Sequence, residues 1–162
     1  SLPSQGEIMK WYLLVGLTVL VTVCTLLVRI PFASSGYFNI GDVMIVFSAL
    51  YAGRKAGAVA GGIGSAIADL IGFPIYTPIT LIVKGLEGFI CGLGHGKKPI
   101  YTLIFPLLGT LLMVGGYFLV EWMIPQFGKA VAFANLPGNL IQAAVGLLGG
   151  RALFEASKLL GI

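Results

Sequence analysis

The chain contains an apolar run from Trp11 to Val28 without a single charged residue, and several later segments are nearly as apolar. An α-helix needs about 20 such residues to cross the ~30 Å hydrocarbon core of a bilayer. Of the 162 residues, 57% are hydrophobic and only 10% are charged, and the mean hydropathy is +0.99. A soluble domain, in which roughly a quarter of the residues are charged, could not bury so much apolar surface. The sequence therefore predicts an all-α integral membrane protein.

Other classes fit the sequence less well. A transmembrane barrel would show segments of ~10 residues that alternate in polarity, and the apolar runs do not alternate. The net charge of +4 does not indicate a nucleic-acid partner, because the basic residues are dispersed at segment ends. Cys24 and Cys91 both lie in apolar runs, so we expect them to pack as small hydrophobes. The run from Trp11 to Val28 is too long for the core of a signal peptide and is expected to stay as a helix.

Prolines, glycines and polar residues divide the chain into six predicted transmembrane helices within one domain, residues 1–162. They cover about residues 9–30, 41–52, 56–71, 78–93, 100–123 and 136–160. Pro31 to Ile40 is predicted as a loop, and Pro125 to Asn135 as the connection before the sixth helix. Gly57, Gly61 and Ser65 recur at four-residue spacing, which predicts a close helix–helix seam without chemistry of its own.

The basic residues predict the orientation in the membrane. With six spans both termini lie on one side, and that side holds seven basic residues: Lys10, Arg54, Lys55, Lys97, Lys98, Arg151 and Lys158. The other side holds only Arg29 and Lys129, and Lys84 lies within a span. Basic residues concentrate in cytoplasmic loops, so both termini are expected in the cytoplasm.

Polar residues inside the apolar segments are the candidate binding groups, because such residues are costly in a membrane unless they find a partner or a ligand. With this topology they converge on the outer half of the bundle, and Asp42 is expected at the external start of the second helix. The set comprises Asn39, Asp42, Asp69, Lys84, Glu87, Asn139 and Gln142. The inner half is apolar and glycine-rich, so a pocket open to the outside is expected instead of a continuous pore.

Structural explanations compete with binding at several of these positions. Lys84 and Glu87 are close enough in sequence to form a purely structural ion pair. Asp42 and Asn139 each stand near a predicted helix start, where capping is an alternative role. Outside this set, Glu121 and Glu155 lie near predicted helix ends and are expected to face water. The single histidine, His95, has no second ligand nearby, so no metal site is expected.

The sequence carries no catalytic constellation. It has no Ser/His/Asp set, no CxxC and no HExxH motif. The run from Gly92 to Lys98 resembles a phosphate-binding loop only superficially, since position 91 is Cys91 and no Ser or Thr follows the lysine. We therefore expect neither an enzyme nor a cofactor, and any active transport must draw on ATP hydrolysis by partner subunits.

Several motifs, in this order, resemble the substrate-binding S components of energy-coupling factor (ECF) vitamin transporters. They are Asn39-Ile-Gly-Asp42, Ala49-Leu-Tyr-Ala-Gly-Arg54, Gly61-Gly-Ile-Gly-Ser-Ala-Ile-Ala-Asp69, Pro74-Ile-Tyr-Thr-Pro78, Lys84-Gly-Leu-Glu-Gly88 and Pro137-Gly-Asn-Leu-Ile-Gln142. The resemblance covers nearly the whole chain. It is closest to the riboflavin-like branch, and within it to S components for hydroxymethylpyrimidine, pyridoxine and related vitamins.

This resemblance implies a multi-pass cell-membrane protein, prokaryotic in type, that binds a vitamin and docks on a transmembrane coupling subunit driven by two ATPase subunits. The loop from Pro31 to Ile40, with Tyr37 and Phe38, would gate the pocket. The family presents an Ala-x-x-x-Ala surface of its first helix to the coupling subunit. Here the corresponding candidates are Gly16, Thr18, Thr22 and Thr25, with threonines at the alanine positions.

The lysine–glutamate pair and the amides suit a small heteroaromatic ring, on which Tyr37, Phe38, Phe73 or Tyr76 could stack. This favours hydroxymethylpyrimidine or pyridoxine and leaves riboflavin and pantothenate open. Two functions of other classes also remain: a secondary transporter coupled to protons through Asp69 or Glu87, and a structural membrane subunit.

Overall fold

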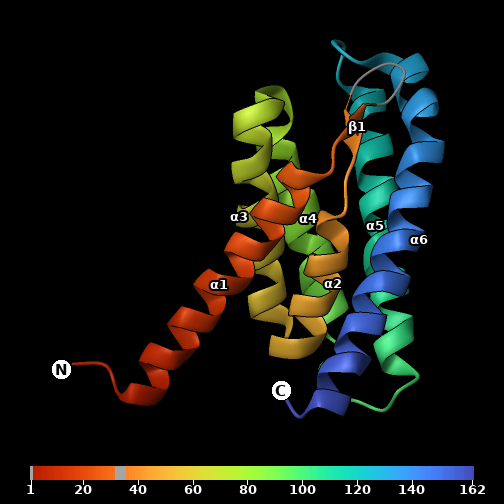
Figure 1. The fold of residues 1–162 in the computed structure, drawn as a ribbon. Coiled ribbons are helices and arrows are strands. Elements are labelled where there is room, and N and C mark those ends of the chain that lie inside the picture. Colours follow the sequence, from red (N-terminus) through yellow and green to blue (C-terminus); the bar gives the residue numbers. More distant parts are fainter. Residues whose placement is uncertain (1, 32–35) are drawn as a thin grey trace.

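The computed structural model describes residues 2–31 and 36–162, which form a helical bundle (Figure 1). Its helices are α1 (Gln5–Leu27), α2 (Gly41–Ala52), α3 (Arg54–Gly72), α4 (Thr77–Gly92), α5 (Tyr101–Met123) and α6 (Gly128–Leu160). The shorter elements are strands β1 (Ile30–Pro31) and β2 (Tyr37–Phe38) and the 3-10 turn η1 (Pro74–Tyr76). The expected all-α class is confirmed.

Four segments of the described chain are long and apolar enough to cross a membrane: α1, η1 with α4, α5 and α6. Leucines, isoleucines and valines lie exposed along these helices. A soluble protein would hide such side chains, whereas lipid solvates them, and the helices satisfy their backbone polar groups internally. α2 is apolar but has only 12 residues.

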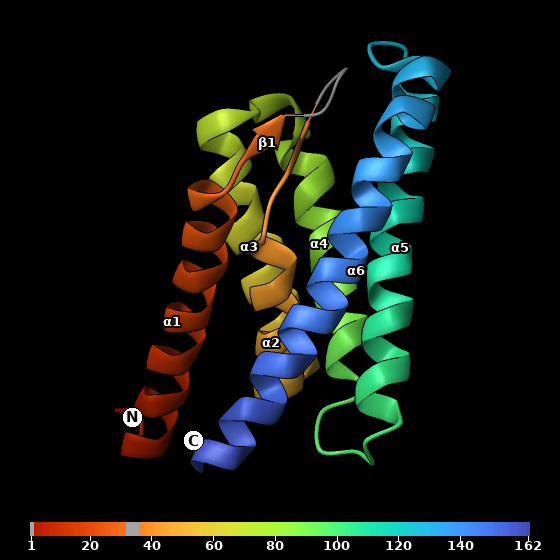
Figure 2. The same cartoon turned by 45° about the vertical axis from the view of Figure 1, so that its right-hand side comes forward.

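The helices pack as two pairs, α3 with α4 and α5 with α6, and α4 also contacts α5. α2 lies against α3, α4 and α6, and α1 covers α3 and α2 from one side. The two chain ends lie at the same end of the bundle as the α4–α5 turn, and the β1–β2 hairpin lies at the opposite end (Figures 1 and 2). The N-terminal half of α1 extends away from the other helices in Figure 1.

Glycines set the close approach of α3 and α4. A Cβ placed on Gly88 would lie 1.9 Å from the carbonyl oxygen of Gly57, and one on Gly61 would lie 2.8 Å from the carbonyl oxygen of Lys84. Only glycine fits such backbone contacts, so the predicted packing seam on α3 is confirmed. It holds α4, and with it Lys84, firmly in place.

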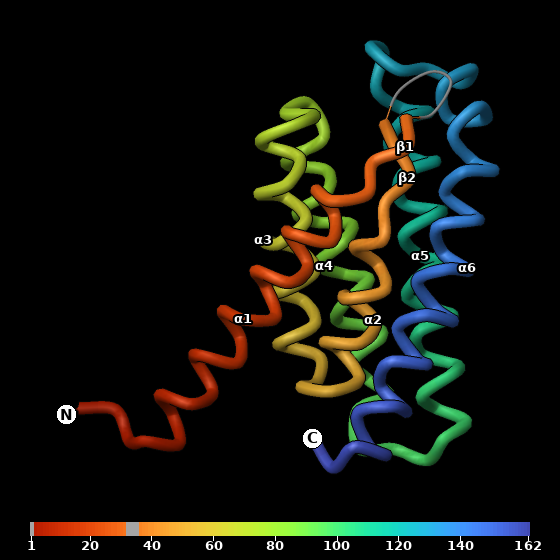
Figure 3. Tube along the Cα trace, viewed as in Figure 1, coloured from red at the N-terminus to blue at the C-terminus, as the bar shows by residue number. Residues whose placement is uncertain are grey.

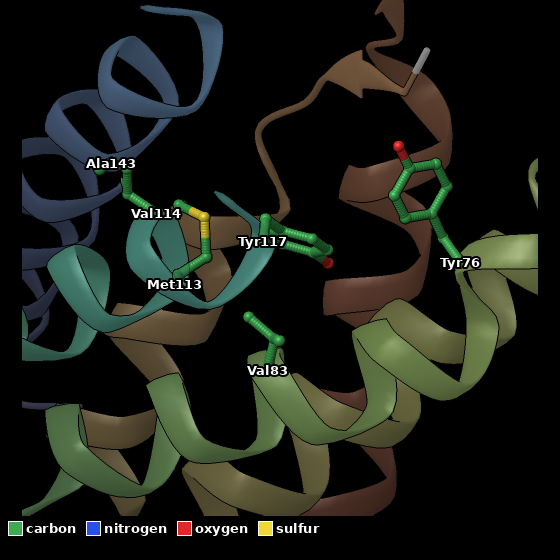
Figure 4. Close-up of a cluster of buried hydrophobic side chains, with 6 residues drawn as sticks. All are labelled: Tyr76, Val83, Met113, Val114, Tyr117 and Ala143. Carbon is green, nitrogen blue, oxygen red and sulfur yellow. The ribbon is translucent and has the colours of Figure 1, made fainter. Parts of the chain in front are cut away.

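Next to this seam lies a core cluster between α4, α5 and α6. Val83 points from α4 toward Met113 and Tyr117 of α5 (Figure 4), and Val114 and Ala143 complete the packing with η1's Tyr76. Since all six are buried, they fix the relative positions of three helices that carry polar residues close by.

The chain between α1 and α2 enters the bundle instead of staying at its surface. β1 and β2 pair in antiparallel fashion, with Ile30 opposite Phe38 and Pro31 opposite Tyr37. From there the trace descends between the helices to the start of α2 (Figure 3). The predicted loop from Pro31 to Ile40 therefore contains a short ladder, and its residues 32–35 lie outside the described part.

Three predicted helix boundaries are wrong: the start of α6 and both ends of α1. α6 begins at Gly128 and not near Leu136, so the expected connection from Pro125 to Asn135 shortens to one turn and Pro137 lies inside the helix. Proline is tolerated within membrane helices, because neighbouring groups satisfy the backbone atoms that it frees. α1 begins four residues early, at a capping box formed by Ser4 and Glu7, and ends at Leu27.

Candidate functional site

A cavity of about 50 Å³ lies among the elements near the hairpin end, between β2, α1, α3, α4, α5 and α6. Its lining is almost entirely polar or aromatic: Thr25, Gly36, Tyr37, Asn39, Ser65, Asp69, Tyr76, Thr80, Lys84, Tyr117, Glu121, Asn135, Asn139 and Gln142. Six of the predicted binding residues are among them: Asn39, Asp69, Tyr76, Lys84, Asn139 and Gln142. The convergence expected from the sequence is thus present.

Beside the cavity lies a group of four polar side chains that we call the Lys84 cluster: Lys84, Asp42, Glu87 and Gln142. Of these four, Lys84 and Gln142 line the cavity. The ammonium of Lys84 donates a short hydrogen bond to Asp42 Oδ1 and lies 3.6 Å from Glu87 Oε2. Gln142 Nε2 donates to Asp42 Oδ2 at 2.7 Å. All four side chains are buried, so each charge relies on the others instead of on water.

This cluster corrects the expected depth of Asp42. The residue was expected at the external face, but it contacts Lys84 in the middle of α4 because the chain descends into the bundle before α2 begins. The expected pair of Lys84 and Glu87 exists, although Asp42 is the closer partner. Neither Asp42 nor Glu87 lines the cavity itself. Both carboxylates act on the cavity indirectly, because they contact the ammonium group of Lys84, which does line it.

Asp42 does not cap α2, because its carboxylate bonds to Lys84 and Gln142. Asn39 makes a local side-chain hydrogen bond where α2 begins. Its Oδ1 accepts a hydrogen bond from the backbone N–H of Gly41 at 2.8 Å, at the start of α2. Its own backbone N–H donates to Gln142 Oε1 at 3.1 Å. Asn139, the other residue for which capping was considered, lies in the middle of α6, so capping does not explain its position.

A second set of cavity-lining side chains forms a row of hydrogen bonds from the β1–β2 hairpin to α5. The Tyr37 hydroxyl donates a short hydrogen bond to Asp69 Oδ1, and Thr80 donates to Asp69 Oδ2 at 2.5 Å. Thr80 and the Tyr117 hydroxyl lie 2.7 Å apart. The ring of Tyr37 also lies 4.7 Å from the Arg29 guanidinium carbon. Thr80 and Tyr117 were not predicted, because threonine and tyrosine in apolar helices carry no distinctive sequence signal.

Tyr37 and Phe38 of the predicted gate differ in position. Tyr37 is buried and lines the cavity, whereas Phe38 is half-buried and does not. Phe73 also lies outside the lining, but its ring packs against Tyr37 with 4.8 Å between centroids. Of the four aromatic residues considered for stacking on a ligand, Tyr37 and Tyr76 therefore face the cavity.

The expectation that Glu121 faces water is wrong. The residue is 2% exposed and lines the cavity. Its Oε1 accepts hydrogen bonds from the Tyr76 hydroxyl and from Asn135 Nδ2, both at 2.9 Å. The late start predicted for the sixth helix hid this contact, because Asn135 was assigned to a connection instead of to a helix facing α5. Glu155, by contrast, leaves 41% of its side chain exposed and pairs with Lys158 at 2.6 Å.

The threonine face of α1 is used within the chain. Thr22 donates to the carbonyl oxygen of Gly64 on α3 at 2.8 Å, and Thr25 is buried and lines the cavity. Thr18 is half-buried and bonds back to Leu14. Of the four predicted docking residues, only Gly16 lies fully on the exposed surface.

Within residues 2–31 and 36–162, no group of three or more His, Cys, Asp or Glu side chains could hold a metal ion. His95, at the end opposite the hairpin, has its Nδ1 2.7 Å from the carbonyl oxygen of Leu50. The histidine therefore holds the α4–α5 turn against α2.

Comparisons with known proteins place the chain in a family. The family described as "ECF-type riboflavin transporter, S component" matches residues 10–158. A protein of Pyrococcus woesei described as "Uncharacterized protein in gap 3'region" is 42% identical over 136 residues, which cover 82% of this chain and 90% of the relative. The "Thiamine precursor transporter HmpT" of Lactococcus lactis subsp. cremoris is 32% identical over 134 residues, 82% of this chain and 76% of the relative. This chain, a multi-pass membrane protein and not an enzyme, belongs to the family of ECF-type riboflavin transporter S components.

Proposed function

We propose that the chain binds a small vitamin precursor within the membrane, with hydroxymethylpyrimidine as the favoured ligand. The observation that carries this proposal is the buried Lys84 cluster beside a polar cavity in a bundle with an apolar exterior. Ionisable residues inside membrane bundles mark substrate sites by default. The relative from Lactococcus lactis, which is named as a thiamine precursor transporter, supports a ligand of the pyrimidine type.

The size and lining of the cavity support a small ring over a large one. Three tyrosines, Tyr37, Tyr76 and Tyr117, line it together with amides and charged groups. Its volume of about 50 Å³ is far below the ~300 Å³ of a typical ligand pocket, so side chains must move when a ligand enters. Tyr37 is our candidate for the moving group, since it lines the cavity and belongs to the loop from Pro31 to Ile40 that is proposed as the gate. Riboflavin, with three fused rings, would require a much larger rearrangement.

Delivery of the ligand into the cell would depend on partners. In the proposed complex, a transmembrane coupling subunit and two ATPase subunits supply the energy, since this chain has no ATP-binding motif. The exposed side of α1 around Gly16 and Thr18 is the proposed docking surface, because α1 packs on the rest of the bundle along one side only.

We further propose that the chain crosses the membrane six times with both termini in the cytoplasm. α2 alone would span only about 18 Å at ~1.5 Å per residue. The segment 36–40, in which Tyr37–Phe38 is strand β2, adds at most roughly 16 Å at ~3.3 Å per residue. Such non-helical backbone is tolerated at membrane depth where protein surrounds it, and here Tyr37 and Asn39 are buried.

The test is ligand binding by the chain purified alone in detergent. Titration calorimetry with hydroxymethylpyrimidine, pyridoxine, riboflavin and pantothenate should show tight one-to-one binding of hydroxymethylpyrimidine. Lys84→Gln removes a charged donor and should weaken binding about 10- to 100-fold. Lys158→Gln, a change of the same type at an exposed lysine, should leave the affinity unchanged.

The same preparation separates the competing classes. Vesicles that contain this chain without partners should bind hydroxymethylpyrimidine but should not accumulate it. Accumulation, or a proton-dependent current, would identify a secondary transporter instead. Failure to bind any of the four compounds would favour a structural subunit.

A further inference from the structure

Glu121 lies at the end of the cavity formed by η1, α5 and α6. Only one of its two carboxyl oxygens is used among the described residues: Oε1 accepts from the Tyr76 hydroxyl and from Asn135 Nδ2. The Tyr76 ring is itself held by Phe127, 5.0 Å away in a stacked arrangement, and by the edge of Tyr117 at 6.2 Å. The orientation of the Glu121 carboxyl group is therefore fixed by packed neighbours.

The second oxygen, Glu121 Oε2, is buried and has no hydrogen-bond partner in the part of the chain that the structure describes. A buried acceptor without a donor costs free energy, and the cost is larger for a charged group than for a neutral one. A side chain that only anchored Tyr76 and Asn135 would need a single oxygen, so a glutamine or an asparagine would serve as well. Glu121 also lines the cavity that a ligand is proposed to enter.

We propose that Glu121 is a specificity-determining residue whose Oε2 accepts a hydrogen bond from an N–H or O–H group of the ligand. This inference rests on the proposed function, because it assumes that the ligand occupies this cavity. Tyr76 and Asn135 act as positioning residues that hold the carboxyl group. The ligand thus needs a donor at its Glu121 end.

Lys84, which lines the same cavity, suits the opposite ligand chemistry, because its ammonium group donates hydrogen bonds. Its ammonium group has three N–H donors, and the protein supplies one short bond to Asp42 and the longer contact to Glu87. Because Lys84 also lines the cavity, a ligand acceptor such as a ring nitrogen fits there. A donor toward Glu121 and an acceptor toward Lys84 define one orientation of a small polar ring. The pocket would then reject rings that lack the donor.

The experiment pairs a change in the protein with a change in the ligand. Hydroxymethylpyrimidine carries two donors, the exocyclic amino group and the hydroxyl group. Two analogues, one with a methyl group in place of the amino group and one with a methyl in place of the hydroxymethyl group, each remove one. Affinities are measured by calorimetry for the full wild-type chain, for Glu121→Gln and for the exposed-site control Glu155→Gln. Glu121→Gln keeps an acceptor for Tyr76 and Asn135 but puts an amide N–H at the free position.

One of the two analogues lacks the donor that bonds to Glu121. The wild type and Glu155→Gln should bind this analogue about 10- to 100-fold more weakly than hydroxymethylpyrimidine. In Glu121→Gln, hydroxymethylpyrimidine itself should bind about 10- to 100-fold more weakly, and the preference for that donor should disappear. Equal affinity of wild type for all three compounds would overturn the inference without any variant, even if Glu121→Gln failed to fold. A donor preference that persists in Glu121→Gln would overturn it as well, with the proposed function intact. If the wild type binds none of the three, the proposed ligand is wrong and the inference fails with it.

Discussion

Lys84 contacts two carboxylates, and the two contacts differ in distance and in hydrogen bonding. Asp42 forms a short hydrogen bond to the ammonium and accepts another from Gln142, whereas Glu87 lies 3.6 Å away and makes no hydrogen bond to any described residue. Removing one partner of a buried pair costs about 3–5 kcal/mol, because the other charge stays buried. Asp42→Asn should therefore lower the unfolding temperature of the ligand-free protein in detergent by about 10 °C.

Glu87→Gln is the matched change, since it replaces the second carboxylate by an amide at the same lysine. Two carboxylates face one ammonium, so a neutral amide at position 87 leaves a balanced pair of Lys84 and Asp42, and we expect a shift of at most about 3 °C. Thermal unfolding followed by circular dichroism compares both variants with the wild type. Equal losses for the two would mean that Lys84 depends on both carboxylates alike.

The sequence predicted much of the residue-scale site because buried charges in apolar segments are conspicuous. Asp69, Lys84, Asn139 and Gln142 were expected together, and they line one cavity. Glu121 was missed, since its place near a predicted helix end indicated a solvated carboxylate. Its burial depends on Asn135 and Tyr76, which lie on other elements. Only the packing of those elements reveals the contact.

At the scale of helices, α3 and α4 depend on Gly88 for their close crossing. A methyl group at this position would lie 1.9 Å from the carbonyl oxygen of Gly57, so Gly88→Ala must push the helices apart. Overpacking of this kind costs about 1–3 kcal/mol. We expect a lower unfolding temperature and, because Lys84 lies one turn away on α4, weaker hydroxymethylpyrimidine binding.

The control for this prediction is Gly115→Ala on α5, where a Cβ would meet nothing within 4 Å. Alanine has the higher helix propensity by about 1 kcal/mol, so this variant should be as stable as the wild type or more so. The two variants are compared by thermal unfolding and by calorimetric titration. Similar losses in both would show that helix flexibility, and not the crossing distance, is what the glycines provide.

The number and order of the helices could be predicted, because long apolar runs separated by turn residues indicate them. The residues at which the helices begin and end were harder to predict. Pro137 indicated a helix start, yet α6 continues through it from Gly128. The descent of the chain before α2 was also not predictable, because Tyr37 and Asn39 find their partners, Asp69 and Gln142, far away in the sequence.

For the whole molecule, the two ends of the bundle differ in charge. Seven basic residues lie toward the end that holds both termini, and Arg29 and Lys129 lie toward the hairpin end. We therefore expect a cysteine at Lys129 to react with a membrane-impermeant maleimide in intact cells, and a cysteine at Lys97 to react only after lysis. Both lysines are exposed, so access to the side chain is comparable.

The background must lack Cys24 and Cys91, and replacing both by alanine removes one half-buried and one buried thiol. A hydroxymethylpyrimidine titration of this background verifies that its site is intact before labelling. Reversed labelling would turn the cavity toward the cytoplasm and contradict uptake from outside. Labelling of both cysteines in intact cells would contradict a crossing of the membrane by α5, which lies between the two positions. The expected pattern places the cavity, which lies near the hairpin end, within reach of external ligand.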